Sequence, residues 1–155
     1  FSAWREAIEQ ARSAGGAFKS LEAALKRPDT VRALQLGNRR LVELPRDICE
    51  LQNLEHLDLY LNQLTTLPAE IGRLKRLRSL DLRFNKIETL PESFAMLESL
   101  EGVNLADNRL REIPRWVARM PKLTSFFVPG NPIDSASMAW IKRARPGLEV
   151  DYRAT

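Results

Sequence analysis

The 155-residue sequence contains one cysteine, Cys49, and one histidine, His56. A single cysteine excludes an internal disulfide, and it leaves no set of thiolates for a structural zinc site. Cys49 follows the apolar Ile48 and has no histidine near it in the sequence, so no neighbour would activate its thiol. We therefore expect an inert, reduced thiol and a cytoplasmic protein, or one delivered into a host cell as an effector.

Long hydrophobic runs are also missing. No apolar stretch approaches the ~18 residues of a membrane-spanning helix, and the first residues lack the basic and apolar segments of a secretory signal. We expect a soluble monomer with no membrane association. The sequence begins at Phe1 rather than at methionine, and we expect either a mature form or a piece of a longer protein.

Charge of one sign is only slightly in excess, because 24 Lys and Arg face 20 Asp and Glu for a net charge of +4. The basic residues are spread among acidic ones, which predicts a solvated mixed-charge surface rather than a nucleic-acid-binding face. No glycine-rich phosphate loop occurs, so we expect no cofactor. The length and the 44% hydrophobic content are those of one folded domain.

A repeat of 23 residues organises the chain: Pro45, Pro68, Pro91 and Pro114 recur at that interval. Five frames begin at Val31, Leu54, Leu77, Leu100 and Leu123. The second frame reads LxxLxLxxNxLxxLPxxIxxL without a gap. The third and fourth frames follow it, and the fifth keeps it as far as Ile133 and then departs. The first frame departs from it, with Arg39 at the asparagine position and Asn38 one residue earlier.

This pattern resembles the leucine-rich-repeat family, in the 23-residue class of bacterial intracellular proteins and plant Ras-group proteins. The resemblance covers about residues 21–152 and implies an α/β right-handed solenoid, a horseshoe arc with five parallel strands on its concave face. It also implies a protein-binding function as a scaffold, adaptor or recognition arm. Members of this class include regulators associated with small GTPases and the substrate-recognition parts of bacterial effector ubiquitin ligases.

The residues support the same fold on physical grounds. Alternation around each LxL segment predicts a short strand with its leucines on one side, and identical registers stack these strands in parallel. Stacked neighbours bury leucines that one repeat could not bury alone. The asparagine after each strand predicts an internal ladder, since its amide can satisfy backbone groups at the turn.

Both ends are predicted to be caps, over residues 1–30 and 134–155. Two apolar helical faces are expected to cover the first repeat: Trp4, Ala7, Ile8 and Ala11, then Phe18, Leu21, Ala24 and Leu25. A helix from Ser135 to Ala144 and a final strand in LEVDY are expected to close the other end. We therefore expect a single domain over residues 1–155, with a complete repeat array at 31–133.

The candidate protein-binding residues are those that the strands and their rim point away from the leucines. They are His56, Asp58, Tyr60, Leu61, Asp81, Arg83, Phe84, Asn104, Asp107 and Phe127. The repeat requires nothing apolar at Tyr60, Leu61, Phe84 or Phe127. Apolar anchors beside charged residues are typical of an interaction hot spot. The expected partner is another protein, such as a small GTPase or a signalling protein.

His56 and Ser79, with Asp58 and Asp81 beside them, supply the residue types of a hydrolytic triad. On an open sheet they would have no oxyanion hole and no pocket, so we interpret His56 as a solvated histidine and expect no catalytic residues. Two carboxylates fall short of the about 6 to 8 oxygens that calcium needs, so no metal site is expected. A hydrolase would need a closed pocket around His56, and a nucleic-acid binder would need clustered Arg and Lys.

Overall fold

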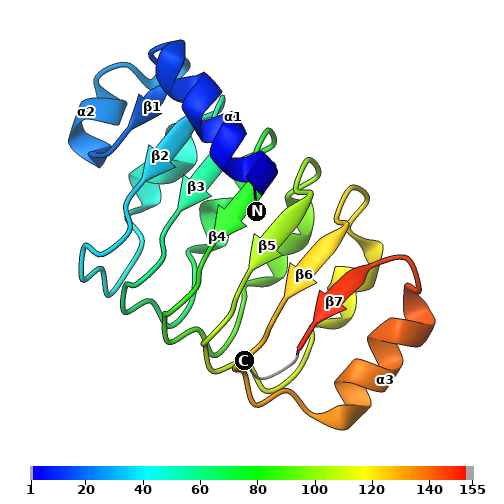
Figure 1. The fold of residues 1–155 in the computed structure, drawn as a ribbon. Coiled ribbons are helices and arrows are strands. Elements are labelled where there is room, and N and C mark those ends of the chain that lie inside the picture. The colour runs from blue at the N-terminus through cyan, green and yellow to red at the C-terminus, as the bar shows by residue number, and fades with distance from the viewer. Residues whose placement is uncertain (1, 153–155) are drawn as a thin grey trace.

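The computed structural model describes residues 2–152, and side chains from residue 5 onward. One sheet of seven parallel strands runs through it in the order β1 to β7, with the other elements on its two sides and at its ends (Figure 1). The strands are β1 (Ala17–Phe18), β2 (Ala33–Gln35), β3 (His56–Asp58), β4 (Ser79–Asp81), β5 (Gly102–Asn104), β6 (Ser125–Phe127) and β7 (Glu149–Asp151). The α-helices are α1 (Ser2–Ser13), α2 (Leu21–Leu25) and α3 (Ser135–Ala144).

The five repeat strands, β2 to β6, begin 23 residues apart and pair in register, for example Leu57 with Leu80. The predicted α/β solenoid is therefore confirmed. The number of strands differs from five because both caps add one, β1 beside β2 and β7 beside β6.

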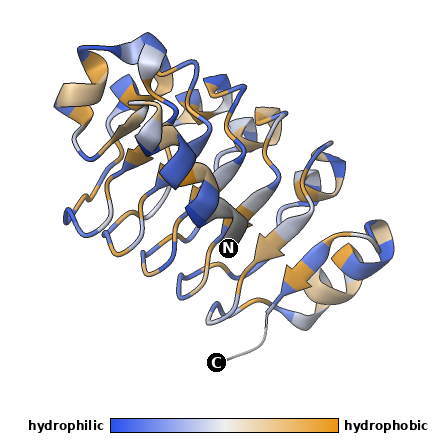
Figure 2. Ribbon diagram, turned by 45° about the horizontal axis from the view of Figure 1, so that its top comes forward, coloured by the Kyte–Doolittle hydropathy of each residue, from blue (hydrophilic) through white to orange (hydrophobic). Residues whose placement is uncertain are grey.

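A 3₁₀ turn follows each repeat proline on the side away from the outward sheet face. These turns are η2 (Arg46–Glu50), η3 (Ala69–Arg73), η4 (Glu92–Met96) and η5 (Arg115–Arg119), and a shorter one, η1 (Pro28–Thr30), lies before the first repeat strand. Proline favours this start because its ring holds φ near the helical value and its missing N–H leaves no donor unpaired. The leucines of the strands and the apolar residues of the turns meet in one continuous core, in which Leu57, Leu80 and Leu82 are at most 2% exposed. Figure 2 shows the resulting alternation of hydrophobic and hydrophilic residues along each repeat.

The predicted asparagine ladder is present at Asn62, Asn85, Asn108 and Asn131. In the Asn85 rung, Nδ2 donates to the carbonyls of Leu59 (2.9 Å) and Leu82 (3.1 Å), while Oδ1 accepts from the Leu64 amide (3.1 Å). In the first repeat the guanidinium of Arg39 donates to the Lys19 carbonyl at 2.8 Å instead. Backbone groups that leave the sheet are thus satisfied inside each turn.

The N-terminal cap differs from the prediction. Phe18 lies in strand β1 rather than in the second helix, which begins at Leu21 after the N-cap Ser20. Strand β1 covers the sheet edge, and α2 covers the end of the core with Ala24 buried. Helix α1 lies across the outward face of the sheet instead of over the first repeat alone (Figure 1). The side chain of Trp4, expected on its apolar face, lies outside the described residues.

The C-terminal cap has the predicted elements. Helix α3 spans Ser135–Ala144, and its N-cap Asp134 accepts from the Ser137 amide at 2.6 Å. The guanidinium of Arg145 donates to the carbonyls of Leu123 (2.6 Å) and Met120 (2.5 Å) and so satisfies acceptors of the last repeat.

Candidate functional site

The rim of the solenoid, where the chain leaves each repeat strand, has the same unusual backbone conformation in every repeat. The rim residues have φ between 54° and 73°: Asn38, Leu61, Phe84, Asp107 and Gly130. Glycine, asparagine and aspartate tolerate this left-handed region, whereas other L-residues lose about 1–2 kcal/mol in it. Leu61 and Phe84 are therefore at positions that the fold would fill more cheaply with another residue.

Both of these apolar side chains are also exposed, at 46% for Leu61 and 49% for Phe84. Next to them Tyr60 is 37% exposed, and the guanidinium carbon of Arg83 lies 5.9 Å from the centre of its ring. We call Tyr60, Leu61, Arg83 and Phe84 the rim cluster. It combines an aromatic ring, two apolar side chains and a cation on one edge of the sheet.

Gly37 positions the Tyr60 ring. A Cβ on Gly37 would overlap the Cδ1 and Cε1 atoms of Tyr60, so the ring occupies space that only glycine leaves free in the first repeat. Tyr60 thus lies against Gly37 while also contacting Arg83.

Arg83 is held in place by Asp81. Its Nε lies 3.0 Å from both carboxylate oxygens of Asp81, and its Nη2 lies 2.7 Å from Oδ2. The hydrogen bond with Asp81 raises the pKa of Arg83 above its ordinary value. A bidentate pair of this kind fixes the direction of the guanidinium.

Asp58 occupies the same register position one repeat earlier, but it has no arginine of its own repeat at the place that Arg83 takes beside Asp81. Tyr60 stands where Arg83 stands in the next repeat, and the only hydrogen bond to the Asp58 carboxylate among the described residues comes from the Tyr60 amide (3.0 Å). Burial raises the pKa of Asp58, and the hydrogen bond from Tyr60 opposes that rise only in part. Asp58 is therefore a half-buried carboxylate that interacts with Arg83 electrostatically, while the close ion pair of Arg83 is with Asp81.

Helix α1 turns this part of the sheet into a pocket. Arg5 and Ile8 of α1 and residues of β2, β3 and β4 enclose about 230 Å³. We call this cavity the sheet pocket, and its other lining residues are Gln35, His56, Leu57, Asp58, Ser79, Asp81 and Arg83. Because Arg83 lies in both places, the sheet pocket is continuous with the rim cluster.

His56 is buried at the base of this region, so our interpretation of it as a solvated histidine is wrong. It is 7% exposed, and its Nδ1 lies 2.6 Å from the Oγ of Ser79, which is 4% exposed. Burial lowers the pKa of His56, which favours the neutral ring. The residues at its register position on the neighbouring strands, Ala33 and Ser79, are buried as well, so this row of the sheet lies close against its neighbours instead of facing open solvent.

The His56–Ser79 pair lacks the other parts of a hydrolytic site. In the described part of the chain, no carboxylate hydrogen-bonds to His56, and the nearby aspartates are engaged by the Tyr60 amide and by Arg83. Within residues 2–152 no group of three or more histidines, cysteines or acidic residues gathers to hold a metal. The pair links β3 to β4 without the geometry of a triad.

The ten predicted binding residues fall into three groups by exposure. Tyr60, Leu61, Phe84 and Asp107 are exposed, and Asp58, Asp81, Arg83 and Phe127 are half-buried. His56 and Asn104 are buried, the latter with Oδ1 accepting from the Ala106 amide at 3.0 Å. Three further residues that line the sheet pocket, Arg5, Ile8 and Gln35, are not among the ten predicted binding residues. The length of α1 could have indicated that this helix reaches several strands, because 12 helical residues span about 18 Å, which is more than three strand spacings of the sheet.

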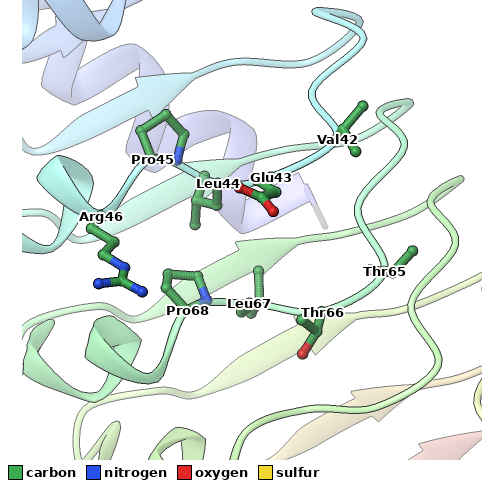
Figure 3. Close-up of a pocket in the computed structure, with 9 residues that line it drawn as sticks. All are labelled: Val42, Glu43, Leu44, Pro45, Arg46, Thr65, Thr66, Leu67 and Pro68. Carbon is green, nitrogen blue, oxygen red and sulfur yellow. The ribbon is translucent and has the colours of Figure 1, made fainter.

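A second hollow of about 470 Å³ lies between the first two repeats, where the chain runs from the rim to the proline turns (Figure 3). Its lining residues are Val42, Glu43, Leu44, Pro45, Arg46, Thr65, Thr66, Leu67 and Pro68. The charged ones, Glu43 and Arg46, are exposed, and the rest bring no set of polar groups together. This hollow is therefore a weaker candidate than the sheet pocket.

Comparison with known families identifies the repeat. The model of the leucine-rich repeat region matches residues 24–125, about two thirds of the chain. The chain belongs to the leucine-rich-repeat family. Members of this family are generally protein-interaction modules and typically not enzymes.

Among solved structures, this leucine-rich-repeat chain is similar to a leucine-rich-repeat protein of Leptospira interrogans, with 27% sequence identity and a TM-score of 0.79. The match covers 88% of this chain and 35% of the Leptospira protein, so the chain spans about a third of that protein's length. No curated protein matches the sequence. Of the helices in the described residues, none is long and apolar enough to cross a membrane.

Proposed function

We propose that this leucine-rich-repeat chain is a protein-interaction module that binds a partner protein through its rim cluster and the adjoining outward face of the sheet. The observation that carries the proposal is the pair of exposed apolar side chains, Leu61 and Phe84, in the left-handed backbone conformation. Their left-handed backbone conformation destabilises the fold. Because both side chains are exposed, burial within this chain offsets little of that cost. A partner that covers them would explain both features.

A partner needs the rim as well as the sheet for a stable interface, because the outward face of the sheet alone is small. Seven short strands about 4.8 Å apart expose on the order of 300 Å² in projection, whereas a standard interface removes about 800 Å² from each partner. Helix α1 already covers part of that face. A partner therefore gains most of its contact area by extending over the rim cluster, where aromatic and arginine side chains provide the usual anchors.

Within this proposal the partner is a signalling protein, such as a small GTPase, and the module acts as a monomeric scaffold, adaptor or recognition arm in the cytoplasm. The buried, unpaired Cys49 suits a reducing compartment. An alternative is that the chain is the substrate-recognition part of a larger bacterial effector such as a ubiquitin ligase, and the partial coverage of the Leptospira protein is compatible with a longer parent protein.

The test compares three proteins: the unmodified chain, a Tyr60→Ala/Phe84→Ala variant, and an Arg73→Glu/Arg119→Glu variant. The last variant changes exposed residues of the 3₁₀ turns on the opposite side. Proteins retained by the unmodified chain are identified by affinity capture, and the affinities are then measured by calorimetric titration. We expect the rim variant to lose at least about 2 kcal/mol of binding free energy, or roughly 30-fold in affinity, with its fold intact. Loss of binding by the turn variant alone would contradict the proposal.

A further inference from the structure

The net positive charge of the chain is concentrated in its C-terminal part. Residues 109–155 contain nine Lys and Arg against four Asp and Glu, whereas residues 1–108 contain 15 against 16. The even mixture of charges that we expected from the sequence is therefore limited to the first part of the chain. A region of one charge attracts partners of the opposite charge and speeds their association.

The earlier repeats pair their cations with acidic residues of neighbouring repeats, and this pairing stops before the C-terminal cap. Arg78 lies 3.2 Å from Glu101, which occupies the same register position in the next repeat. The following position in this row is the uncharged Thr124. Within residues 2–152, no lysine or arginine beyond Arg109 is in an ion pair.

Three of the exposed cations lie around the C-terminal end of α3, at the end of the solenoid (Figure 1). Lys142 and Arg143 are in the last turn of α3. Arg145, directly after the helix, donates to the Leu123 carbonyl at 2.6 Å and so holds this end of α3 against the segment that contains Lys122. We call Lys122, Lys142 and Arg143 the cap cluster.

The carboxylates of this region do not neutralise the cap cluster. Asp134 is the N-cap at the opposite end of α3, where Arg115 interacts with it electrostatically. In the preceding repeat Glu101 is already paired, and the exposed Glu98 forms no ion pair in the described residues. The cap cluster likewise has no ion pair, in the part of the chain that the structure describes, with any of the four acidic residues beyond position 108, which are Glu112, Asp134, Glu149 and Asp151.

We propose that the C-terminal cap is a second protein-binding surface, on which the cap cluster binds a short acidic segment of a partner protein. Glutamate and aspartate side chains of that segment supply the missing counter-ions, and Arg143 is able to bind a carboxylate through two nitrogens. This inference goes beyond the rim cluster, which belongs to the repeats of β3 and β4, whereas the cap cluster lies at the end of the solenoid. An acidic segment bound at the cap leaves the rim cluster open.

The aromatic residues beside the cap cluster favour carboxylates over a nucleic acid. Lys142 Nζ lies 4.7 Å from the centre of the Tyr152 ring, and the guanidinium carbon of Arg115 lies 4.3 Å from the centre of the Trp140 ring. Rings covered by cations are not free to stack with bases. The three cations of the cap cluster are also few beside the roughly six to ten phosphate contacts of a typical DNA-binding protein.

The experiment measures binding of a fluorescein-labelled peptide of eight glutamates by fluorescence anisotropy. A peptide of eight glutamines with the same label is the neutral control. We expect saturable binding of the glutamate peptide alone, and its affinity should fall as the salt concentration rises from about 50 to about 300 mM, because ions screen the attraction. The absence of saturable binding at the lower salt concentration would overturn the inference.

The key variant is Lys122→Glu/Arg143→Glu, which should bind the glutamate peptide at least about tenfold more weakly. The matched control is Arg73→Glu/Arg76→Glu, which lowers the net charge by the same amount. Both control residues are exposed, and Arg76 has the register position of Lys122 two repeats earlier. The control should bind as the unmodified chain does, and circular dichroism checks that both variants fold. Equal losses in the two variants would overturn the inference, because overall charge would then account for the binding.

Two further measurements separate this surface from other binding modes. Single-stranded octathymidylate is used as a competitor, and tighter binding of this oligonucleotide than of the glutamate peptide would replace the acidic segment with a nucleic acid. The Tyr60→Ala/Phe84→Ala variant should bind the glutamate peptide as the unmodified chain does. Loss of peptide binding in that variant would contradict a separate cap surface, whereas failure of the rim cluster to bind its own partner would leave the cap surface standing.

Discussion

Asp58 combines a negative charge with surroundings that disfavour it, and this has a measurable effect on stability. Its pKa is raised in the folded state, chiefly by burial, with Asp81 adding to the rise and Arg83 opposing it. The folded chain therefore binds this proton more tightly than the unfolded chain. The resulting stabilisation is present below the ordinary pKa of 3.8 and is lost as the pH rises through the raised value.

Asp58→Asn should accordingly raise the melting temperature at pH 7 and change it little at pH 3, where the aspartate is already protonated. Thermal unfolding followed by circular dichroism at the two pH values checks this. The exposed Asp47→Asn is the matched control and should have no comparable effect. A lower melting temperature for Asp58→Asn at pH 7 would mean that the charge stabilises the fold.

Cys49 is expected to be chemically inert in the folded protein. It is 2% exposed, and burial raises its pKa from 9.0 to about 11, with a further rise from Glu70 and a decrease from Arg73. A rise of this size lowers the thiolate fraction at pH 8 about 100-fold. Alkylation by iodoacetamide at pH 8 should therefore be at least about 100-fold slower in the native chain than in urea. Comparable rates in the two states would contradict the buried position of the thiol.

At the scale of the elements, substitutions in the rim turns can separate two contributions to stability: the cost of the left-handed backbone conformation and the loss of side-chain contacts. Phe84→Ala and Phe84→Asn both remove the ring, but asparagine tolerates the left-handed conformation that alanine resists. We expect Phe84→Asn to be more stable than Phe84→Ala by about 1 kcal/mol in urea unfolding. The same substitutions at Lys86, which is exposed and does not have a positive φ, should show no such preference for asparagine. Equal stability of the two Phe84 variants would indicate that the turn relaxes.

The repeat strands could be predicted from the sequence because each frame independently shows the same alternation of leucines that predicts a strand. Strand β1 could not, because Ala17 and Phe18 have no leucine pattern and pair only through the edge of β2. The turn of the first repeat was also uncertain. The structure gives Asn38 the same left-handed conformation as the other rim residues and adds a second positive φ at Arg40.

The candidate site was less predictable than the fold. The rim residues follow directly from the register, so Tyr60, Leu61 and Phe84 could be identified as exposed. The sheet pocket depends on where α1 lies, because Arg5 and Ile8 line it. An amphipathic pattern predicts that a helix packs against something, but it does not identify the surface that the helix covers. The sheet pocket therefore emerged only from the three-dimensional arrangement of α1 and the strands.

At the scale of the whole molecule, stability should depend on position along the solenoid. Leu82 lies in the central repeat and is fully buried between repeats on both sides, whereas Leu148 lies in the C-terminal cap and is 7% exposed. Leu82→Ala should cost about 2–5 kcal/mol, and Leu148→Ala about half as much, because a cap residue has fewer neighbours to lose. Urea unfolding of the two variants tests this expectation. Equal losses would argue against stabilisation by nearest-neighbour stacking.

Helix α1 makes the outward sheet face asymmetric. It covers the face near β2, β3 and β4, while strands β5 to β7 lie beyond the end of the helix (Figure 1). A partner that uses both the rim cluster and the uncovered strands must therefore approach in one orientation along the solenoid.

The repeated left-handed rim position has a consequence for how such a chain can change its specificity. Five rim positions, 23 residues apart, share one backbone conformation, and the chain already places asparagine, leucine, phenylalanine, aspartate and glycine there. A new side chain at one of the four rim positions that already hold one leaves the leucine core of its repeat untouched, whereas a Cβ at the fifth, Gly130, would overlap the side chain of Asp107 in the neighbouring repeat. At those four positions recognition can therefore be changed one residue at a time, by evolution or by design, with the scaffold held constant.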